Sequence, residues 1–443
     1  MRFGKVFWEF LWLGCISFGG PAAHVGYFHR RFVVRLGWLD EATYARLLAL
    51  TQFLPGPASS QLGFAIGRHR GGLAGGVAAF LGFTLPSFLI MVMVALYATR
   101  LPEAWLNGLV TGLKWLAVVV VADAVLNLGG KFCRDRFTRG VALATAVVLW
   151  LFPGVGVQLL ALLVAALIGR HWLKPSAAPE DAGAGESRVA WLPFGLFATA
   201  WLLLWLIGGG TLGGLARDFY SAGALVFGGG HVVLPLLEGF VGDAMSQDQF
   251  LTGYATAQAV PGPMFSLAAY LGAQLAPASP WLGAGVATLA IFLPGFLLVL
   301  ALSDAWRALA ARPAMAGAVA GINAAVVGLL LAALYQPVFL SAVAGPRDLA
   351  LVVLGFLALR SGRVPLLALV VAMAAGTIAH VTLDPTESMQ TLSSFLLQNG
   401  LTQVTGRGEE QHLVFAVGLL LFVITLFFYE MGRRFSLRYK GSF

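Results

Sequence analysis

The chain has 443 residues, of which 59% are hydrophobic and only 11% are charged, whereas about 25% of the residues of a soluble domain are charged. This composition and the mean hydropathy of +0.84 exclude an ordinary soluble protein. The net charge of +8 at pH 7 comes from Lys and Arg in short loops and at the C-terminus. Such residues orient a membrane protein, so the charge does not indicate a nucleic-acid partner.

Apolar segments suited to membrane helices recur along the whole chain. Continuous runs such as Gly76–Tyr97 and Leu413–Tyr429 are typical of bilayer-spanning α-helices, whereas the strands of a membrane β-barrel alternate apolar and polar residues. We therefore predict an all-α polytopic membrane protein, surrounded by the lipid bilayer. The predicted segments are 71–98, 105–128, 140–152, 155–172, 190–209, 281–303, 314–336, 347–360, 364–381 and 412–430.

Two further regions, 3–70 and 215–275, are apolar but interrupted by Gly and Pro. The polar stretch KPSAAPEDAGAGESR (Lys174–Arg188) cannot build a packed core and divides the chain into halves. The N-terminus resembles the charged start of a signal peptide, but no convincing cleavage site follows, so we expect it to be retained. We predict a first repeat at 1–173, a cytoplasmic linker at 174–189, a connecting span with the second repeat at 190–411, and an extra span with a basic cytoplasmic tail at 412–443.

The two halves share four short motifs in the same order. Preserved order and spacing over more than about a hundred residues indicate an internal duplication, as in many secondary transporters. SFGGPAAH (Ser17–His24) corresponds to VFGGGHVV (Val226–Val233), TQFLPGP to AQAVPGP, FTLPSFLI (Phe83–Ile90) to IFLPGFLL (Ile291–Leu298), and GLK (Gly112–Lys114) to GIN (Gly321–Asn323).

Basic residues occupy loops of the first half, whereas the corresponding loops of the second half are acidic or neutral. HRRFVVR (His29–Arg35) and RHR (Arg68–Arg70) contrast with EGFVGDAMSQDQ (Glu238–Gln249). Because positive loops stay in the cytoplasm, this contrast predicts two repeats of inverted topology. If the broken regions form re-entrant hairpins, about ten full spans and about four helical hairpins result. An alternative with about 13–14 spans keeps the inversion but violates the charge rule.

The Pro-Gly-Pro sequences are predicted to end one helix and begin another, because Pro removes a backbone donor and Gly relaxes the backbone. Broken backbone in a membrane needs protein or a water-filled cavity around it, and the bare N–H groups of a half-helix bind anions. With nearby hydroxyl and amide donors, the breaks would form a midplane site for a small tetrahedral oxyanion. The candidate residues are Gly19, Gly20, Pro21, Gln52, Pro55, Gly56, Pro57, Ser59 and Ser60 in the first half, and Gly229, Gly230, Gln258, Pro261, Gly262, Pro263 and Ser266 in the second.

Several of these motifs also carry a family resemblance. SFGGPAAHVGYF, GWLDEATYARLLALTQFLPGPASSQLGFAIG and GFTLPSF resemble the chromate ion transporter family in its long two-repeat form, and FGGGHVVLPLLE and QAVPGPMFSLAAYLG resemble its second repeat. The resemblance covers nearly the whole chain. It implies a bacterial inner-membrane transporter that expels chromate, a sulfate analogue, using the proton motive force, and so confers chromate resistance. Composition and spacing alone indicate only an oxyanion secondary transporter.

Four polar residues in the broken and spanning segments are further candidates for substrate binding. His24 and His231 follow the first break of each half and could donate to an oxyanion or carry a proton, or could instead pack against the backbone. Lys114, with Asn323 as its counterpart, lies inside an apolar span and could help to neutralise a dianion, or could extend to the interface.

Three carboxylates are candidates for proton coupling. Asp123 lies nine residues after Lys114 on roughly the opposite helical face, so it is a poor ion-pair partner for that lysine. Glu9 and Glu238 flank the broken elements. An ionisable side chain inside a membrane is costly and is a functional candidate by default.

The residues leave other functions open. They do not separate chromate from sulfate, so an importer or exchanger of sulfate or another oxyanion is an alternative, as is an anion channel. We expect no enzyme, metal or cofactor, because Cys15 and Cys133 form no disulfide or metal-binding pattern and no phosphate loop is present. The short hairpins at 140–172 and 347–381 are expected to be scaffold or the contact of a homodimer.

Overall fold

The computed structural model describes residues 2–18, 20–97, 103–173, 189–207, 209–227, 233–241, 244–306, 312–361, 364 and 369. Residues 174–188 of the predicted linker (174–189) and the predicted span at 412–430 lie outside these residues, as does nearly all of the predicted span at 364–381. Within the described residues the secondary structure is helical throughout, without a strand, so the all-α prediction is confirmed.

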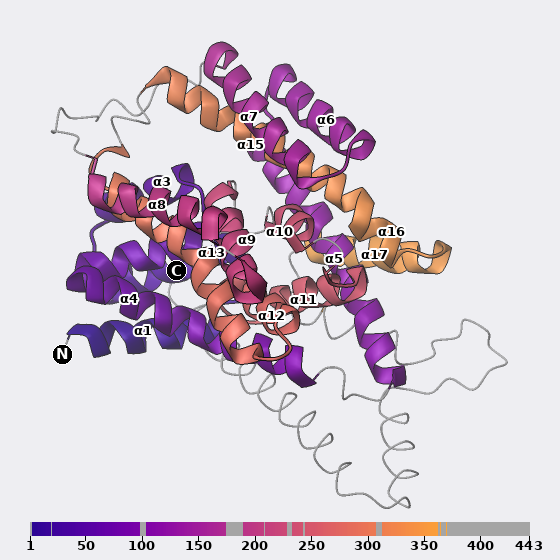
Figure 1. Ribbon diagram of the computed structural model, residues 1–443, viewed down its shortest axis with the longest axis horizontal. Helices are drawn as coiled ribbons and strands as arrows, with labels where there is room; N and C mark the ends of the chain where they lie inside the picture. Colours follow the sequence, from indigo (N-terminus) through magenta and orange to yellow (C-terminus); the bar gives the residue numbers. More distant parts are fainter. Residues whose placement is uncertain are drawn as a thin grey trace, which may run out of the picture. The chain divides into compact units, whose positions relative to one another are not determined.

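The first half contains helices α1 to α7, which cover the segments predicted from the sequence (Figure 1). Each helix of the broken region before α4 has 15 residues or fewer, which is short of the roughly 20 needed to cross a bilayer. The elements are α1 (Arg2–Ile16), α2 (Gly20–Phe28), η1 (His29–Arg35), α3 (Glu41–Phe53), α4 (Ala58–Tyr97), α5 (Glu103–Phe132), α6 (Arg136–Leu151) and α7 (Val155–Trp172).

The second half repeats this order after the connecting helix α8. Helices α6 and α7 of the first half run beside α15 of the second (Figure 1), so the halves share one packed body. The elements are α8 (Trp191–Ile207), α9 (Gly210–Leu225), α10 (Val233–Val241), α11 (Gln247–Ala259), η5 (Met264–Ser266), α12 (Leu267–Leu275), α13 (Pro280–Leu302), α15 (Pro313–Ala333), η6 (Leu334–Phe339), α16 (Leu340–Ala342) and α17 (Pro346–Arg360).

Helix α4 is a helical hairpin rather than one straight rod. Gly71 and Gly72 leave helical geometry, and Gly72 has a φ of +65°. The turn brings Gly67 of the first arm against the backbone of Gly75 in the second, where a Cβ on either residue would clash. Small residues allow helix backbones to approach this closely. The turn falls where the sequence predicts the spanning segment 71–98 to begin.

The second repeat builds the same hairpin from α12 and α13. There Gly272 lies against Gly283, as Gly67 lies against Gly75 in α4. The preceding helices also match, because Gly14 of α1 packs on the carbonyl of Phe83 and Gly223 of α9 packs on that of Ile291. Phe83 and Ile291 are the residues that the motif alignment pairs. The duplicated sequence therefore folds twice into the same packing arrangement.

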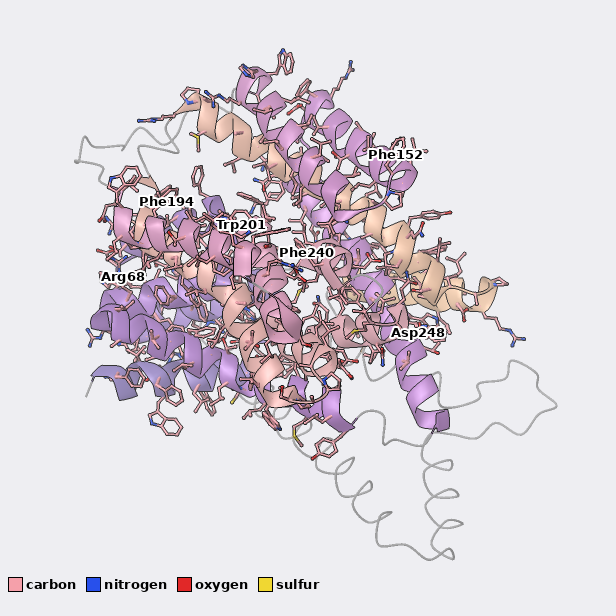
Figure 2. The ribbon with its side chains drawn as sticks, in the orientation of Figure 1. Arg68, Phe152, Phe194, Trp201, Phe240 and Asp248 are labelled. Carbon is pink, nitrogen blue, oxygen red and sulfur yellow. The ribbon has the colours of Figure 1, made fainter. Side chains whose placement is uncertain are left out.

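The outer surfaces of the helices are apolar, as a bilayer requires. Five of the described helices are long and apolar enough to cross a membrane, among them Val110–Phe132, Pro280–Leu302 and the 40-residue α4 that contains the hairpin turn. Large side chains such as Trp191 and Leu206 of α8 are more than two-thirds exposed, and Phe152 and Phe194 also lie on the surface (Figure 2). Apolar exposure on this scale indicates contact with lipid, so the chain is a multi-pass membrane protein.

The basic run His29–Arg35, which its charge predicts to be a loop, is helical in the structure. It forms the π-helical turn η1, which continues α2. The cause is Phe32, which is fully buried and stacks on Phe10 of α1 and on Trp38. Burial of this ring holds the backbone in a helix, while Arg30, Arg31 and Arg35 remain half-exposed or exposed.

Candidate functional site

Both Pro-Gly-Pro sequences break the chain as predicted. Helix α3 ends at Phe53 and α4 begins at Ala58, while α11 ends at Ala259 and η5 begins at Met264. The central glycines, Gly56 and Gly262, have φ values of +120° and +105°. Only glycine adopts this region without strain, which explains why each proline pair encloses a glycine.

The two breaks are tied to each other's repeat by reciprocal backbone hydrogen bonds. The N–H of Gly56 donates to the carbonyl of Val226 at 2.7 Å, and the N–H of Gly262 donates to that of Ser17 at 3.0 Å. Ser17 and Val226 are counterparts in the motif alignment, and each follows the first helix of its repeat. A pair of equivalent contacts in both directions is the pattern of two units related by a two-fold axis.

Each break also lies against the proline-containing helix of the other repeat. A Cβ on Gly56 would approach Cα of Gly295 in α13 at 3.1 Å, and a Cβ on Gly262 would approach Oγ of Ser87 in α4 at 2.9 Å. Gly295 and Ser87 are again counterparts. The two Pro-Gly-Pro loops and the LPSF and LPGF segments therefore form one crossed cluster between the repeats.

Gln61 fixes this cluster on the side of the first break. Its Nε2 donates to the carbonyl of Pro55 at 2.8 Å and to that of Gly295 at 3.1 Å. The backbone N–H of Gln61 donates to the carbonyl of Pro57 at 2.9 Å, which is the first rung of the α4 ladder. The N–H groups of residues 58–60 therefore precede the ladder and have no acceptor within the helix.

Five buried hydroxyl groups of the two repeats have no partner within the described part of the chain. Ser60 and Ser266, which occupy matching positions after the two breaks, are 3% and 1% exposed. Neither hydroxyl finds a hydrogen-bond partner among the described residues, and the same holds for Ser17, Thr84 and Thr288. Buried polar groups are nearly always paired, so these hydroxyls indicate a place for a polar ligand or water. The sequence predicts Ser60 and Ser266 as site residues but not the other three, although Ser17 and Thr84 lie inside the repeated motifs.

His24 is a fully buried histidine at the first break. Its Nε2 donates to the carbonyl of Ser17 at 3.2 Å, and its ring lies edge-on to Phe83 with centroids 5.1 Å apart. The opposite nitrogen, Nδ1, has no partner among the described residues. In the neutral ring Nδ1 is an acceptor, so it would donate to an anion only when protonated.

The rest of the first-break motifs is only partly described. Gly20 has a φ of +72° and begins α2, with Pro21 as its next residue. Gly19, Gly229, Gly230 and His231 lie outside the described residues.

The paired glutamines make different contacts. The exposed Gln52 accepts a hydrogen bond from Nζ of Lys131 at 3.3 Å, which places a cation beside the first break. The buried Gln258 contacts Sδ of Met264 through Nε2 at 2.8 Å. Lys131, in the last turn of α5, was not among the site residues predicted from the sequence.

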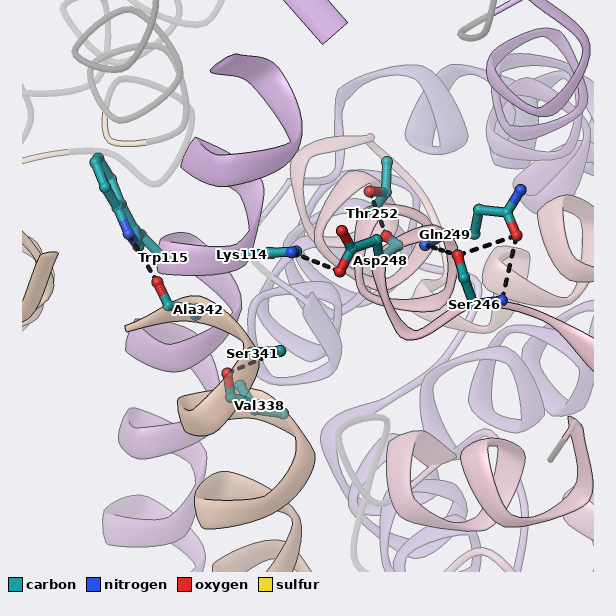
Figure 3. A network of polar contacts seen from close by, with 9 residues as sticks. All are labelled: Lys114, Trp115, Ser246, Asp248, Gln249, Thr252, Val338, Ser341 and Ala342. Carbon is teal, nitrogen blue, oxygen red and sulfur yellow. Dashed lines mark hydrogen bonds and ion pairs between the residues drawn. The ribbon is translucent and has the colours of Figure 1, made fainter. Parts of the chain in front are cut away.

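Lys114 lies away from the breaks. Its Nζ forms an ion pair with Oδ1 of Asp248 at 2.5 Å, between α5 of the first repeat and the first turn of α11 in the second (Figure 3). The Pro-Gly-Pro loop follows the other end of α11, whose 13 residues span about 20 Å. The lysine side chain is 13% exposed and that of the aspartate is 60% exposed. Asn323, the counterpart of Lys114, is buried in α15.

Two of the three candidate proton carriers are paired with arginines. Glu9 binds Arg31 through Oε2, 2.6 Å from an arginine nitrogen, and Asp123 binds Arg360 at 3.3 Å. Glu238 of α10 is partly buried and has neither an ion pair nor a hydrogen bond among the described residues.

The sequence that builds this crossed cluster matches a known protein family. The family model for the chromate transporter matches the chain twice, over residues 4–170 and 213–379. The chain belongs to the chromate transporter family. Its members are transport proteins and not enzymes, and the two matches agree with the duplication seen in the motifs and in the packing.

Curated relatives support this assignment. A probable chromate transport protein of Synechococcus elongatus is 31% identical over 347 residues, which cover 73% of this chain and 81% of the relative. A chromate transport protein of Cupriavidus metallidurans is 30% identical over 340 residues, with coverages of 73% and 80%. An uncharacterised transporter of Bacillus subtilis is 32% identical over 147 residues, which are 33% of this chain but 73% of the relative. No solved structure matches the chain.

Proposed function

We propose that the chain exports chromate from the cytoplasm across the bacterial inner membrane and so confers chromate resistance. The substrate is supported by the names of the curated relatives. The observation that carries the proposed site is the crossed cluster, in which each helix-starting break binds the other repeat and buried hydroxyls lack partners. Chromate is a tetrahedral dianion that only accepts hydrogen bonds, so a cluster of N–H and O–H donors suits it.

In this proposal the anion occupies the space before the first turns of α4 and of η5–α12. Ser60 and Ser266 donate from their hydroxyls, and the bare N–H groups of residues 58–60 donate from the backbone. The prolines and glycines of both breaks shape the backbone without contacting the anion through side chains. Lys114 remains outside the contact shell, because Asp248 already neutralises it at the far end of α11.

The proposed mechanism is alternating access by two repeats of inverted topology. The contrast between basic loops in the first half and acidic loops in the second supports the inversion. The site lies between the repeats, so relative movement of the repeats would expose it to one side and then to the other. The reciprocal bonds of Gly56 and Gly262 tie each break to the other repeat in the state described.

Glu238 is the carboxylate that we propose for coupling to the proton motive force. Glu9 and Asp123 each form an ion pair with an arginine, whereas Glu238 is partly buried with no cation beside it among the described residues. A carboxylate of this kind can take up and release a proton as the environment changes.

Transport into everted membrane vesicles tests direction and coupling together. We expect saturable chromate uptake that requires an inside-acid gradient, with sulfate as the competitor. Glu238→Gln should abolish the response to the gradient, whereas the matched change Glu41→Gln at an exposed surface pair should not. Uptake that is indifferent to the gradient in the wild-type chain would contradict coupling. Sulfate transport without chromate transport would contradict the proposed substrate, and a unitary conductance would contradict a carrier.

A further inference from the structure

An open cavity lies where α5 ends and α6 begins, outside the crossed cluster. Its volume is about 430 Å³. Arg134 and Arg139 line it together with Cys133, while Gly129 and Gly130 contribute no side chain and so leave the space open. Two apolar residues of the preceding turn of α5 complete the lining.

The charge around this cavity is strongly positive. Residues 131–139 contain Lys131, Arg134, Arg136 and Arg139 but a single carboxylate, Asp135. Asp135 caps α6, where it accepts a hydrogen bond from the N–H of Thr138 at 2.8 Å, and this bond holds the pKa of the carboxyl below its ordinary value. The capping carboxylate is thus committed to the helix and forms no ion pair with the arginines within the described part of the chain.

The end of α5 itself would repel an anion, because the last carbonyls of a helix carry partial negative charge. Arg139 reduces this effect, since its Nε donates to the carbonyl of Cys133 at 3.1 Å. The guanidinium of Arg134 makes no ion pair among the described residues. A cavity with two arginines on its wall and glycines on its floor is therefore suited to an anion.

A basic residue beside the cavity contacts the last turn of α3, just before the first break. Lys131, one turn from Arg134, donates through Nζ to Oε1 of Gln52. Gln52 lies three residues before Pro55, where the first Pro-Gly-Pro break starts. Cations thus extend from the cavity wall to the last turn of α3.

We propose that this α5–α6 cavity is a second binding site for a tetrahedral oxyanion, held by Arg134 and Arg139. The ion is either the transported dianion on its way to the break or the phosphate of an anionic lipid headgroup, which offers the same oxygens. The first source rests on the proposed function, but occupancy of the cavity does not require transport. A measurement of oxyanion binding to the cavity therefore tests this proposal directly.

Cys133 provides a local reporter for this measurement. The chain has two cysteines, so Cys15→Ser leaves Cys133 as the sole thiol. We would follow alkylation of Cys133 by a neutral maleimide in the full-length protein. One sample is in neutral detergent with and without sulfate, and another is in nanodiscs with and without phosphatidylglycerol. Oxyanion in the cavity should slow alkylation at least about threefold, and Arg134→Gln with Arg139→Gln should remove that protection.

Arg136→Gln is the control, because it removes a positive charge from the first residue of α6, which does not line the cavity. It should leave at least half of the protection in place. Protection by sulfate in detergent identifies a free oxyanion, and protection by phosphatidylglycerol alone identifies a headgroup. An unchanged rate in every condition overturns the proposal, as does equal loss of protection in the control. Chromate transport by the variant with both Arg134→Gln and Arg139→Gln is measured in a separate experiment. A cavity that binds no oxyanion would therefore not contradict the proposed transport site at the crossed cluster.

Discussion

The two Pro-Gly-Pro breaks have the same backbone but different chemistry. Both central glycines have positive φ, and both donate to the carbonyl that ends the first helix of the other repeat. After the first break the chain reads Ala58–Gln61, with two hydroxyls and an amide, whereas after the second it reads Met264–Leu267, with one hydroxyl. At the second break Phe265 packs against Phe292, an apolar contact where the first break has polar residues. Duplication has thus kept the geometry of the break, while polar contacts have become concentrated on the first copy.

The largest expected effect comes from replacing the central glycines. Gly56→Ala would force a side chain into a φ of +120° and against both Cα of Gly295 and Nε2 of Gln61, whose amide bonds hold the cluster, at a cost of about 1–3 kcal/mol in stability. We expect transport to fall at least about a hundredfold, because the site would be misplaced. Gly262→Ala should do less harm, since it meets the movable hydroxyl of Ser87. Transport rates of both variants, normalised to protein in the membrane, would measure this difference.

Gly26→Ala is the control for these changes, because a Cβ there meets no atom within 4 Å. It should transport like the wild-type chain. Equal and mild effects at Gly56 and Gly262 would contradict the account of the breaks.

A second variant makes the first break resemble the second. Gln61→Leu removes the donor shared by the carbonyls of Pro55 and Gly295 and inserts the residue found after the other break. Unsatisfied buried carbonyls cost about 1–3 kcal/mol. We expect thermal unfolding at a lower temperature and a severalfold lower transport rate, and no such change for Gln247→Leu, which is exposed. Unchanged stability would mean that the amide bonds do not hold the cluster together.

The hydroxyl variants should separate binding from stability. Ser60→Ala deletes a buried hydroxyl that lacks a partner, so the protein without ligand should be no less stable. We expect transport at low chromate to fall about tenfold, which corresponds to about 1.4 kcal/mol, and Ser266→Ala to cost about threefold. Ser341→Ala, whose hydroxyl donates to Val338, is the control. A larger effect at Ser266 than at Ser60 would reverse the assigned asymmetry.

The smallest effect is expected at the ion pair farthest from the breaks. Asp248→Asn removes the partner of Lys114, but the carboxylate is 60% exposed and such pairs contribute at most about 1 kcal/mol. We expect the KM for chromate to stay within about twofold of the wild-type value. A tenfold rise in the KM for chromate when Lys114→Met is added to Asp248→Asn would instead indicate that Lys114 contacts the substrate.

Local sequence was sufficient for the elements and the breaks but not for their contacts. Pro and Gly predict where α3 ends and α4 starts, because backbone limits act within a few residues. The turn at Gly71–Gly72 inside α4 was not predicted from the sequence. Motif order predicts the duplication. The partner of Lys114 and the bond from Gln61 to Gly295 could not be predicted, because they join repeats that are distant in sequence.

The sequence also could not predict which buried polar groups lack a hydrogen-bond partner. Ser17 and Thr84 look like ordinary motif residues until burial shows that their hydroxyls have no partner in the described part of the chain. Lys131 looked like one basic residue among several until its contact with Gln52 placed it beside the break. Composition gives the residue types present, whereas only packing reveals which polar groups are left unsatisfied.

Equilibrium dialysis of labelled chromate against the purified chain in nanodiscs tests the central claim most directly. The account predicts a saturable site that Ser60→Ala combined with Ser266→Ala weakens at least about tenfold, whereas Ser341→Ala leaves it unchanged. Equal chromate affinity in the double variant, with the protein folded, would contradict a substrate site at the two breaks.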